Sequence, residues 1–189
     1  MRDYTRNFAI YYKKGIDENI QLENIEVSSN QLDKVFKFPT RHDYETFVYE
    51  DYAWELFGKC ETCSKNLGAK VNNWITKDIT NIDTDTPIEV IIVSTMEYGL
   101  TIPATLFFIS KLGLKIREVY LPMDSNTIWD RCDALITANP HLLENKPEGK
   151  LSVKINTDYN TKANADYAYT DMNNFIEKIE NVEKLIQKQ

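Results

Sequence analysis

The sequence predicts an α/β fold in which a parallel sheet carries helices on both faces, giving three layers. Residues 88–94, IEVIIVS, are a near-continuous β-branched run, which is typical of a strand buried on both faces. From there onward, strand-like and helix-like patterns alternate four times, as successive right-handed βαβ units require. The last pattern, residues 171–188, places apolar residues at helical spacing behind Asp171 or Thr170 as a cap.

The elements between these two ends follow from local signals. Residues 101–113 predict a helix with Pro103 in its first turn and Gly113 beyond its end. Asn139 can cap a helical turn whose first position is Pro140. Further strands are expected at residues 115–122, 133–138 and 151–155, with a short helix capped by Asp124 or Ser125 between the first two.

The first half of the chain predicts a less regular structure. Residues 33–41 indicate a short apolar strand ended by Pro39, and residues 43–59 and 61–78 indicate two helices. Residues 8–30 alternate loosely, which suggests a hairpin or an arm. We therefore expect an N-terminal arm or hairpin at 1–32 and an α/β domain at 33–189 with a helical insertion at about 42–80.

Composition and charge exclude several classes of protein. The chain of 189 residues is 42% hydrophobic and carries a formal net charge of −7, so a basic surface for nucleic acid is not expected. No apolar run reaches the roughly 18 residues of a membrane span, and the N-terminus lacks a signal-peptide pattern. We expect a cytoplasmic protein with no nucleic-acid or membrane partner.

Short motifs give little support for metal or nucleotide chemistry. Cys60 and Cys63 have the spacing of half a zinc site but lack a second pair of ligands. Asp83 and Asp85 precede a strand, whereas ligands usually bind beyond the carboxyl ends of strands. Phosphate-binding glycine loops are missing from the sequence. We predict no cofactor.

The order of elements, together with the motifs VIIVST (90–95), LITANP (135–140) and TDYN (157–160), resembles the haloacid-dehalogenase-like (HAD) phosphohydrolases, above all their deoxyribonucleotidase branch. The resemblance spans residues 33–187 and implies a Rossmann-like sheet with a helical insertion after the first core strand. In that family the first strand ends in two aspartates, and the strand corresponding to LITANP ends in an acidic pair before Asn-Pro; these acids hold magnesium.

Neither acidic motif is present here. Lys37 and Pro39 stand where the family has its first aspartates, and Thr137 and Ala138 replace the acidic pair. A lysine supplies no carboxylate nucleophile, and magnesium requires oxygen ligands. The resemblance thus implies a pseudo-phosphatase without catalytic residues or metal, in which a vestigial phosphate pocket is formed by Ser94, Thr95, Thr137 and Asn139.

Residues 38–58 and 136–155 also resemble proteins of crAss-like tailed phages. We therefore expect a non-catalytic interaction or assembly protein, with protein partners or self-association, located in a bacterial host's cytoplasm or in a phage virion. Tyr49 and Trp54 flank the apolar stripe of the helix at 43–59, either at an interface or under the N-terminal segment.

Two alternatives stay open. One is a nucleotide sensor that holds phosphate through Ser94, Thr95 and Asn139. The other is a magnesium phosphatase whose acids have relocated to Asp43, Glu50, Asp51 or Asp124.

Overall fold

The computed structural model describes residues 4–21, 32–62, 65–80, 88–94 and 98–178. They belong to two compact units, each formed by two stretches of the chain. The first unit comprises Met1–Lys65 and Met96–Gly113, and the second comprises Asn66–Thr95 and Leu114–Gln189. The arm or hairpin at 1–32 and the domain at 33–189 stay a prediction.

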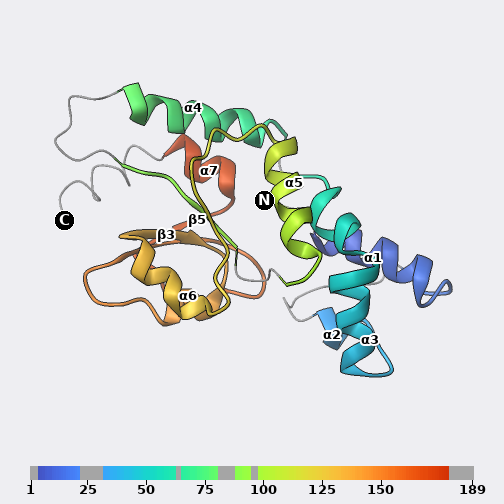
Figure 1. The fold of residues 1–189 in the computed structure, drawn as a ribbon. Helices are drawn as coiled ribbons and strands as arrows, with labels where there is room; N and C mark the ends of the chain where they lie inside the picture. The colour runs from blue at the N-terminus through green and yellow to red at the C-terminus, as the bar shows by residue number, and fades with distance from the viewer. Residues whose placement is uncertain (1–3, 22–31, 63–64, 81–87, 95–97, 179–189) are drawn as a thin grey trace. The chain divides into compact units, whose positions relative to one another are not determined.

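The first unit is helical (Figure 1). Its α3 helix begins with a capping box, in which the Asp43 backbone N–H donates to Thr40 Oγ1 at 3.1 Å and the Thr40 backbone N–H donates to Asp43 Oδ2 at 2.9 Å. Two π-helical turns, η2 and η3, continue from α3. The elements are α1 (Tyr4–Gly15), α2 (Leu32–Val35), α3 (Arg41–Thr46), η2 (Phe47–Asp51), η3 (Trp54–Gly58) and α5 (Thr101–Lys111).

Aromatic rings form the core of this unit. Phe8, on α1, is fully buried, and its ring centroid lies 5.0 Å from that of Phe36 and 5.2 Å from that of Phe47. Tyr12, one turn further along α1, donates its hydroxyl to the Lys37 carbonyl at 2.5 Å. Tyr44, Phe47 and Phe57 of the helices that follow are buried in the same cluster as Phe8 and Tyr12 of α1.

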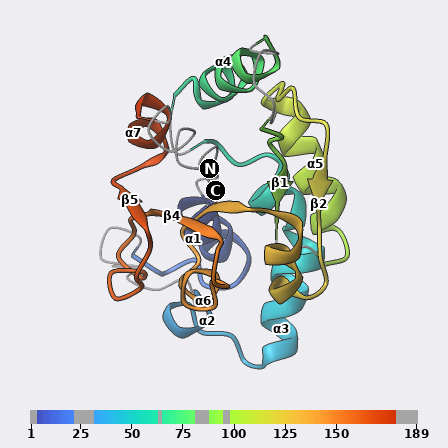
Figure 2. The same ribbon diagram turned by 90° about the vertical axis from the view of Figure 1, so that its left-hand side faces the viewer.

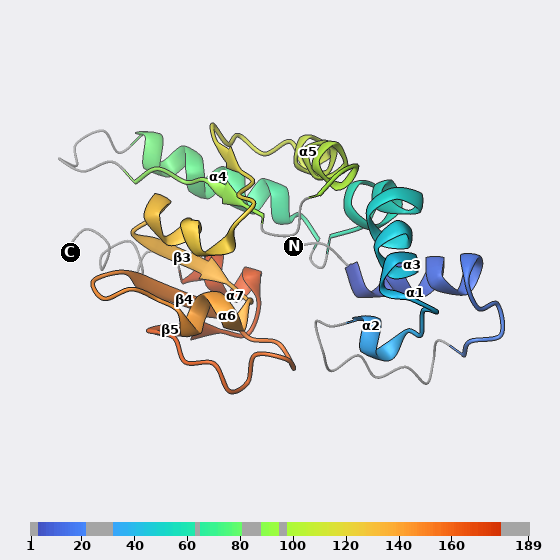
Figure 3. The ribbon, with the colours of Figure 1, turned by 60° about the horizontal axis from the view of Figure 1, so that its bottom comes forward.

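The second unit contains parallel strands in two small sheets, β1-β2 and β3-β4-β5. Figure 2 labels both sheets, and Figure 3 shows β3, β4 and β5 side by side. The elements are α4 (Leu67–Thr80), β1 (Ile92–Val93), β2 (Val119–Tyr120), η4 (Ser125–Arg131, a 3-10 helix), β3 (Ala134–Thr137), α6 (Pro140–Glu144), β4 (Leu151–Ile155), β5 (Tyr167–Tyr169) and α7 (Met172–Glu177).

Alternate residues of β3 pack against different helices. Leu135 joins a cluster with Trp129 of η4 and Leu142 of α6. Its neighbours Ala134 and Ile136 join a second cluster, which includes Phe175 of α7. Since successive strand side chains point to opposite faces, β3 has helical elements on both of its faces.

The predicted α/β character with parallel strands is confirmed, whereas the single three-layer sheet differs from the two small sheets observed. The strand predicted at 33–41 is wrong, because Leu32–Val35 is helix α2. The hairpin suggested for residues 8–30 is wrong for its first part, which lies in α1. Both errors have one cause: short apolar runs do not distinguish a strand from a buried helix. The caps predicted at Asp124, Asn139 and Asp171 are confirmed.

Candidate functional site

The side chains at the carboxyl end of β3 form hydrogen bonds within the turn that follows the strand. Thr137 Oγ1 accepts a hydrogen bond from the Asn139 backbone N–H at 3.1 Å. Asn139 Oδ1 accepts from the His141 backbone N–H at 3.0 Å and so caps α6, with Pro140 in its first turn. The two oxygens predicted to contact phosphate thus have structural partners.

A residue that the sequence analysis did not single out forms further hydrogen bonds at this edge of the sheet. Asn160 is buried, and its Nδ2 donates to the Ala138 carbonyl at 2.9 Å and to the Ile155 carbonyl at 2.8 Å. Its Oδ1 accepts from the Thr157 backbone N–H at 2.9 Å. One amide therefore joins the ends of β3 and β4 and the loop beyond them. The TDYN motif contains this residue, but nothing in the motif indicated burial.

The other half of the predicted phosphate pocket is in a different sheet. Ser94 is half-buried at the end of β1, and its backbone N–H donates to the Tyr120 carbonyl of β2 at 3.2 Å. Thr95 lies outside the described residues. The structure does not place Ser94 and Thr137 in one continuous sheet.

The acids considered as replacements include two with structural roles. Asp43 forms the capping box of α3, and Asp124 Oδ1 accepts from the Asn126 backbone N–H at 2.9 Å. Glu50 and Asp51 are exposed on η2 in the first unit. Within the described part of the chain, no three His, Cys, Asp or Glu side chains are grouped to hold a metal ion.

Of the cysteine and aspartate pairs that the sequence analysis set aside, the structure describes one member, Cys60. Cys60 is buried, with its thiol 3.7 Å from the Phe57 carbonyl that accepts its hydrogen bond. Cys63, Asp83 and Asp85 lie outside the described residues.

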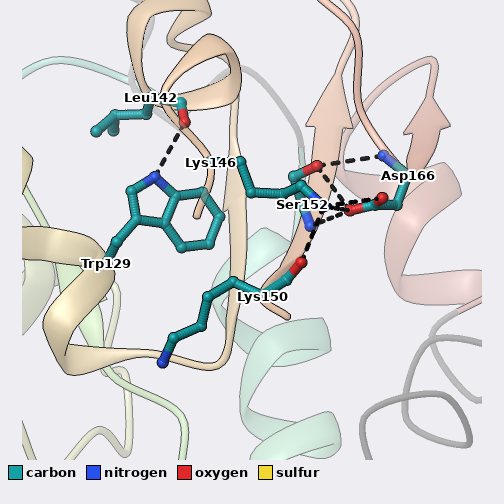
Figure 4. Close-up of polar contacts among 6 residues, drawn as sticks. All are labelled: Trp129, Leu142, Lys146, Lys150, Ser152 and Asp166. Atoms are coloured by element: carbon teal, nitrogen blue, oxygen red, sulfur yellow. Dashed lines mark hydrogen bonds and ion pairs between the residues drawn. The ribbon is translucent and has the colours of Figure 1, made fainter. Parts of the chain in front are cut away.

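A polar cluster of Lys146, Ser152 and Asp166 lies at the other end of β4 (Figure 4). Asp166 Oδ2 accepts from the Ser152 backbone N–H at 2.7 Å and from Ser152 Oγ at 2.9 Å. Lys146 Nζ donates to Asp166 Oδ1 at 3.1 Å and to the Lys150 carbonyl at 3.0 Å. Burial alone would raise the pKa of Asp166, but the hydrogen bonds from Ser152 and Lys146 outweigh it and lower that pKa.

This cluster has the residue types of a nucleophilic site but not the access. Ser152 is only 1% exposed, and its Oγ also accepts from the Asp166 backbone N–H at 3.2 Å. A nucleophile must reach its substrate, so the cluster acts as a clamp that holds the loop before β5 against β4.

Helix α5 carries apolar side chains on its exposed side as well as on its buried side. Its buried residues are Thr101, Ala104, Thr105 and Phe108, whereas Ile102, Leu106 and Phe107 are exposed by 38%, 44% and 45%. A helix with apolar residues all round is typical of the inside of a protein. We define the α5 face as the exposed apolar residues Trp54, Tyr98, Leu100, Ile102, Leu106 and Phe107.

Contacts within the first unit hold the α5 face in place. The ring of Phe107 meets that of Trp54 edge to face, with centroids 5.7 Å apart. A Cβ added at Gly58 would lie 3.1 Å from the Ala104 carbonyl oxygen, so the glycine permits the close approach of η3 and α5. Thr101 Oγ1 donates to the Tyr98 carbonyl at 2.8 Å and fixes the turn that opens α5.

The aromatic helix at 43–59 had two interpretations, and the structure separates them. Tyr49 is partly buried and packs against the core that includes Phe8 and Tyr12 of α1, while Trp54 is 37% exposed. The exposed apolar surface of α5 was not predicted, although the segment TIPATLFFIS has apolar residues on every side of the expected helix.

A scan against models of known protein families finds no match, and no curated protein or solved structure is significantly similar to the chain. Among the described helices, none is long and apolar enough to cross a membrane.

Proposed function

We propose that this protein is a non-catalytic α/β protein that works by binding other protein chains through the α5 face. The exposed apolar side of α5 carries the proposal, since Ile102, Leu106 and Phe107 are exposed although the helix already buries Ala104 and Phe108 on its other side. Exposed apolar patches on globular proteins commonly mark sites of protein interaction. Aromatic residues such as Trp54 and Phe107 are enriched at such sites.

The loss of catalysis is the second part of the proposal. Its support is the turn after β3, where Thr137 and Asn139 accept backbone hydrogen bonds and Asn160 holds the Ala138 carbonyl. A phosphatase of the HAD type would need acidic side chains at this edge. The parallel pair β3-β4, with Asn139 and Pro140 opening α6 between them, supports descent from such an enzyme. A phage particle or phage-encoded complex is the setting we propose.

An activity assay with a matched binding assay tests both parts. Purified protein with magnesium is expected to release no phosphate from p-nitrophenyl phosphate or nucleoside monophosphates above the blank. Proteins that bind the wild type are purified from the cells that express it. Their dissociation constants are then measured with the wild type, Leu106→Asp and Ile10→Asp. Ile10 is the control because it is 42% exposed on α1, close to the 44% of Leu106.

Leu106→Asp should weaken binding at least tenfold, and Ile10→Asp should leave it unchanged. Turnover by the wild type, lost in Thr137→Ala, would overturn the non-catalytic part. Equal binding by both aspartate variants would overturn the role of the α5 face.

A further inference from the structure

We infer that the α5 face binds a second copy of this chain, forming a weak two-fold dimer; this inference rests on the proposed function. Three properties of the face favour a second copy: its lack of charge, its row geometry and its size.

The first property is charge. Residues 98–110, YGLTIPATLFFIS, contain no charged residue, although the chain has a formal net charge of −7. Two copies repel each other over most of their surfaces, but contact through this segment buries no unpaired charge. A partner chosen by electrostatic complementarity would instead be expected to meet acidic side chains on this protein.

The second property is the arrangement of side chains along α5. Ile102, Leu106 and Ser110 follow one another at intervals of four residues, and Pro103 and Phe107 form a parallel row. Rows at this interval pack between the same rows of another helix at a crossing angle near −50°. Because both helices use the same rows, the packing suits a two-fold axis that relates identical surfaces.

The third property is size. The six residues of the α5 face are exposed by between 37% and 70%. An aromatic side chain buries about 150–250 Å² when fully covered, and an aliphatic one somewhat less. Because three aromatic and three aliphatic residues are each about half exposed, the face offers on the order of 500 Å² per copy. Roughly 1,000 Å² for two copies is at the lower limit for a specific interface, which predicts a dimer that dissociates at low concentration.

Sedimentation velocity over a range of protein concentrations tests the inference. The mass should rise from the 22.0 kDa of one chain towards twice that value. Added salt should strengthen the association, because it screens the repulsion between two acidic chains. Leu106→Asp and Leu106→Lys should each weaken it at least tenfold, whereas Ile10→Asp should not. An equimolar mixture of the two Leu106 variants should recover the dimer, because opposite charges then meet across the axis.

Other outcomes overturn the inference in distinguishable ways. A wild type that stays monomeric at every concentration, while Leu106→Asp still loses a purified partner, excludes the second copy but leaves the proposed function intact. A monomer whose unfolding midpoint falls by several degrees in both Leu106→Asp and Phe107→Ser shows that the chain itself covers the face. That result would overturn both proposals. Circular dichroism of each variant confirms that it is folded before its mass is interpreted.

Discussion

The side chain of Asn160 reaches across two strand ends to the carbonyl of Ala138, 22 positions earlier in the chain, with Nδ2 and the carbonyl oxygen 2.9 Å apart. Its second bond, to the Ile155 carbonyl at 2.8 Å, uses the other hydrogen of the same amide. A single buried side chain thus satisfies carbonyls at the ends of both β3 and β4.

Replacing Asn160 should therefore destabilise the protein strongly. Asn160→Ala leaves two carbonyls without their donor, and we expect a loss of about 2–3 kcal/mol in the free energy of unfolding. Asn160→Asp should cost at least as much, because a carboxylate has no hydrogen to donate and is buried here. Urea unfolding measures the change, with the exposed Asn164→Ala as the control. A loss for Asn160→Ala no greater than that of the control would show that these bonds contribute nothing.

Asn139 should tolerate an acidic side chain but not an apolar one. Asn139→Ala removes the cap of α6 and should cost about 1 kcal/mol. Asn139→Asp should keep the cap, because its carboxylate accepts the same bond from His141 and lies near the positive end of the helix. Thermal unfolding compares the two variants. Equal destabilisation by Ala and Asp would contradict the capping role, as would a phosphate-dependent rise in the midpoint that both variants abolish.

The clamp at Asp166 should make stability fall in acid. Since the hydrogen bonds of Ser152 and Lys146 lower the pKa of Asp166 in the folded protein, its contribution is complete above the unfolded value of 3.8. That contribution is lost as the pH falls through the lower, folded pKa. Asp166→Asn should be less stable than wild type at pH 7, and the difference should shrink below pH 3.8. Urea unfolding at several pH values measures it, with the exposed Asp130→Asn as the control. A difference independent of pH would rule out the carboxylate's charge as its cause.

The stability of the first unit should depend on Phe8. Its ring is fully buried among Phe36, Phe47 and other aromatic residues, so Phe8→Ala should cost about 3–5 kcal/mol in the free energy of unfolding. Phe8→Leu should cost less, since it leaves a smaller cavity. Ile10→Ala, two positions away on the exposed side of α1, should change stability by less than about 0.5 kcal/mol. Similar losses at positions 8 and 10 would mean that α1 does not anchor this core.

The sequence was most informative where local signals decide the structure. The caps at Asp124, Asn139 and Asp171 could be predicted because Asp and Asn before a helix commonly accept hydrogen bonds from its first backbone N–H groups. The parallel strands of the second unit could be predicted from β-branched runs that alternate with helical patterns.

Long-range packing was the part that the sequence did not reveal. Phe36, directly after the helix at residues 32–35, packs against Phe8 and Tyr12, and contacts at this distance along the chain leave no local signal in the sequence. Asn160 looked like an ordinary loop residue, and its burial depends on strands that must first be in register. The predicted phosphate contacts at Thr137 and Asn139 used the correct turn, but the same oxygens serve equally well as caps.

The two π-helical turns of the first unit bear on how this segment tolerates changes in length. Tyr44, Val48, Ala53 and Phe57 are all buried, and one of the steps between them is five residues long. A regular α-helix keeps one face at intervals of four, so the longer step is absorbed by the wide turn at η2. Deleting one exposed residue there, such as Glu50, would restore even steps and leave the same four side chains facing the core. The wide turn should therefore make this segment tolerant of a one-residue deletion, whereas the same deletion in α5 would rotate its later residues away from their neighbours.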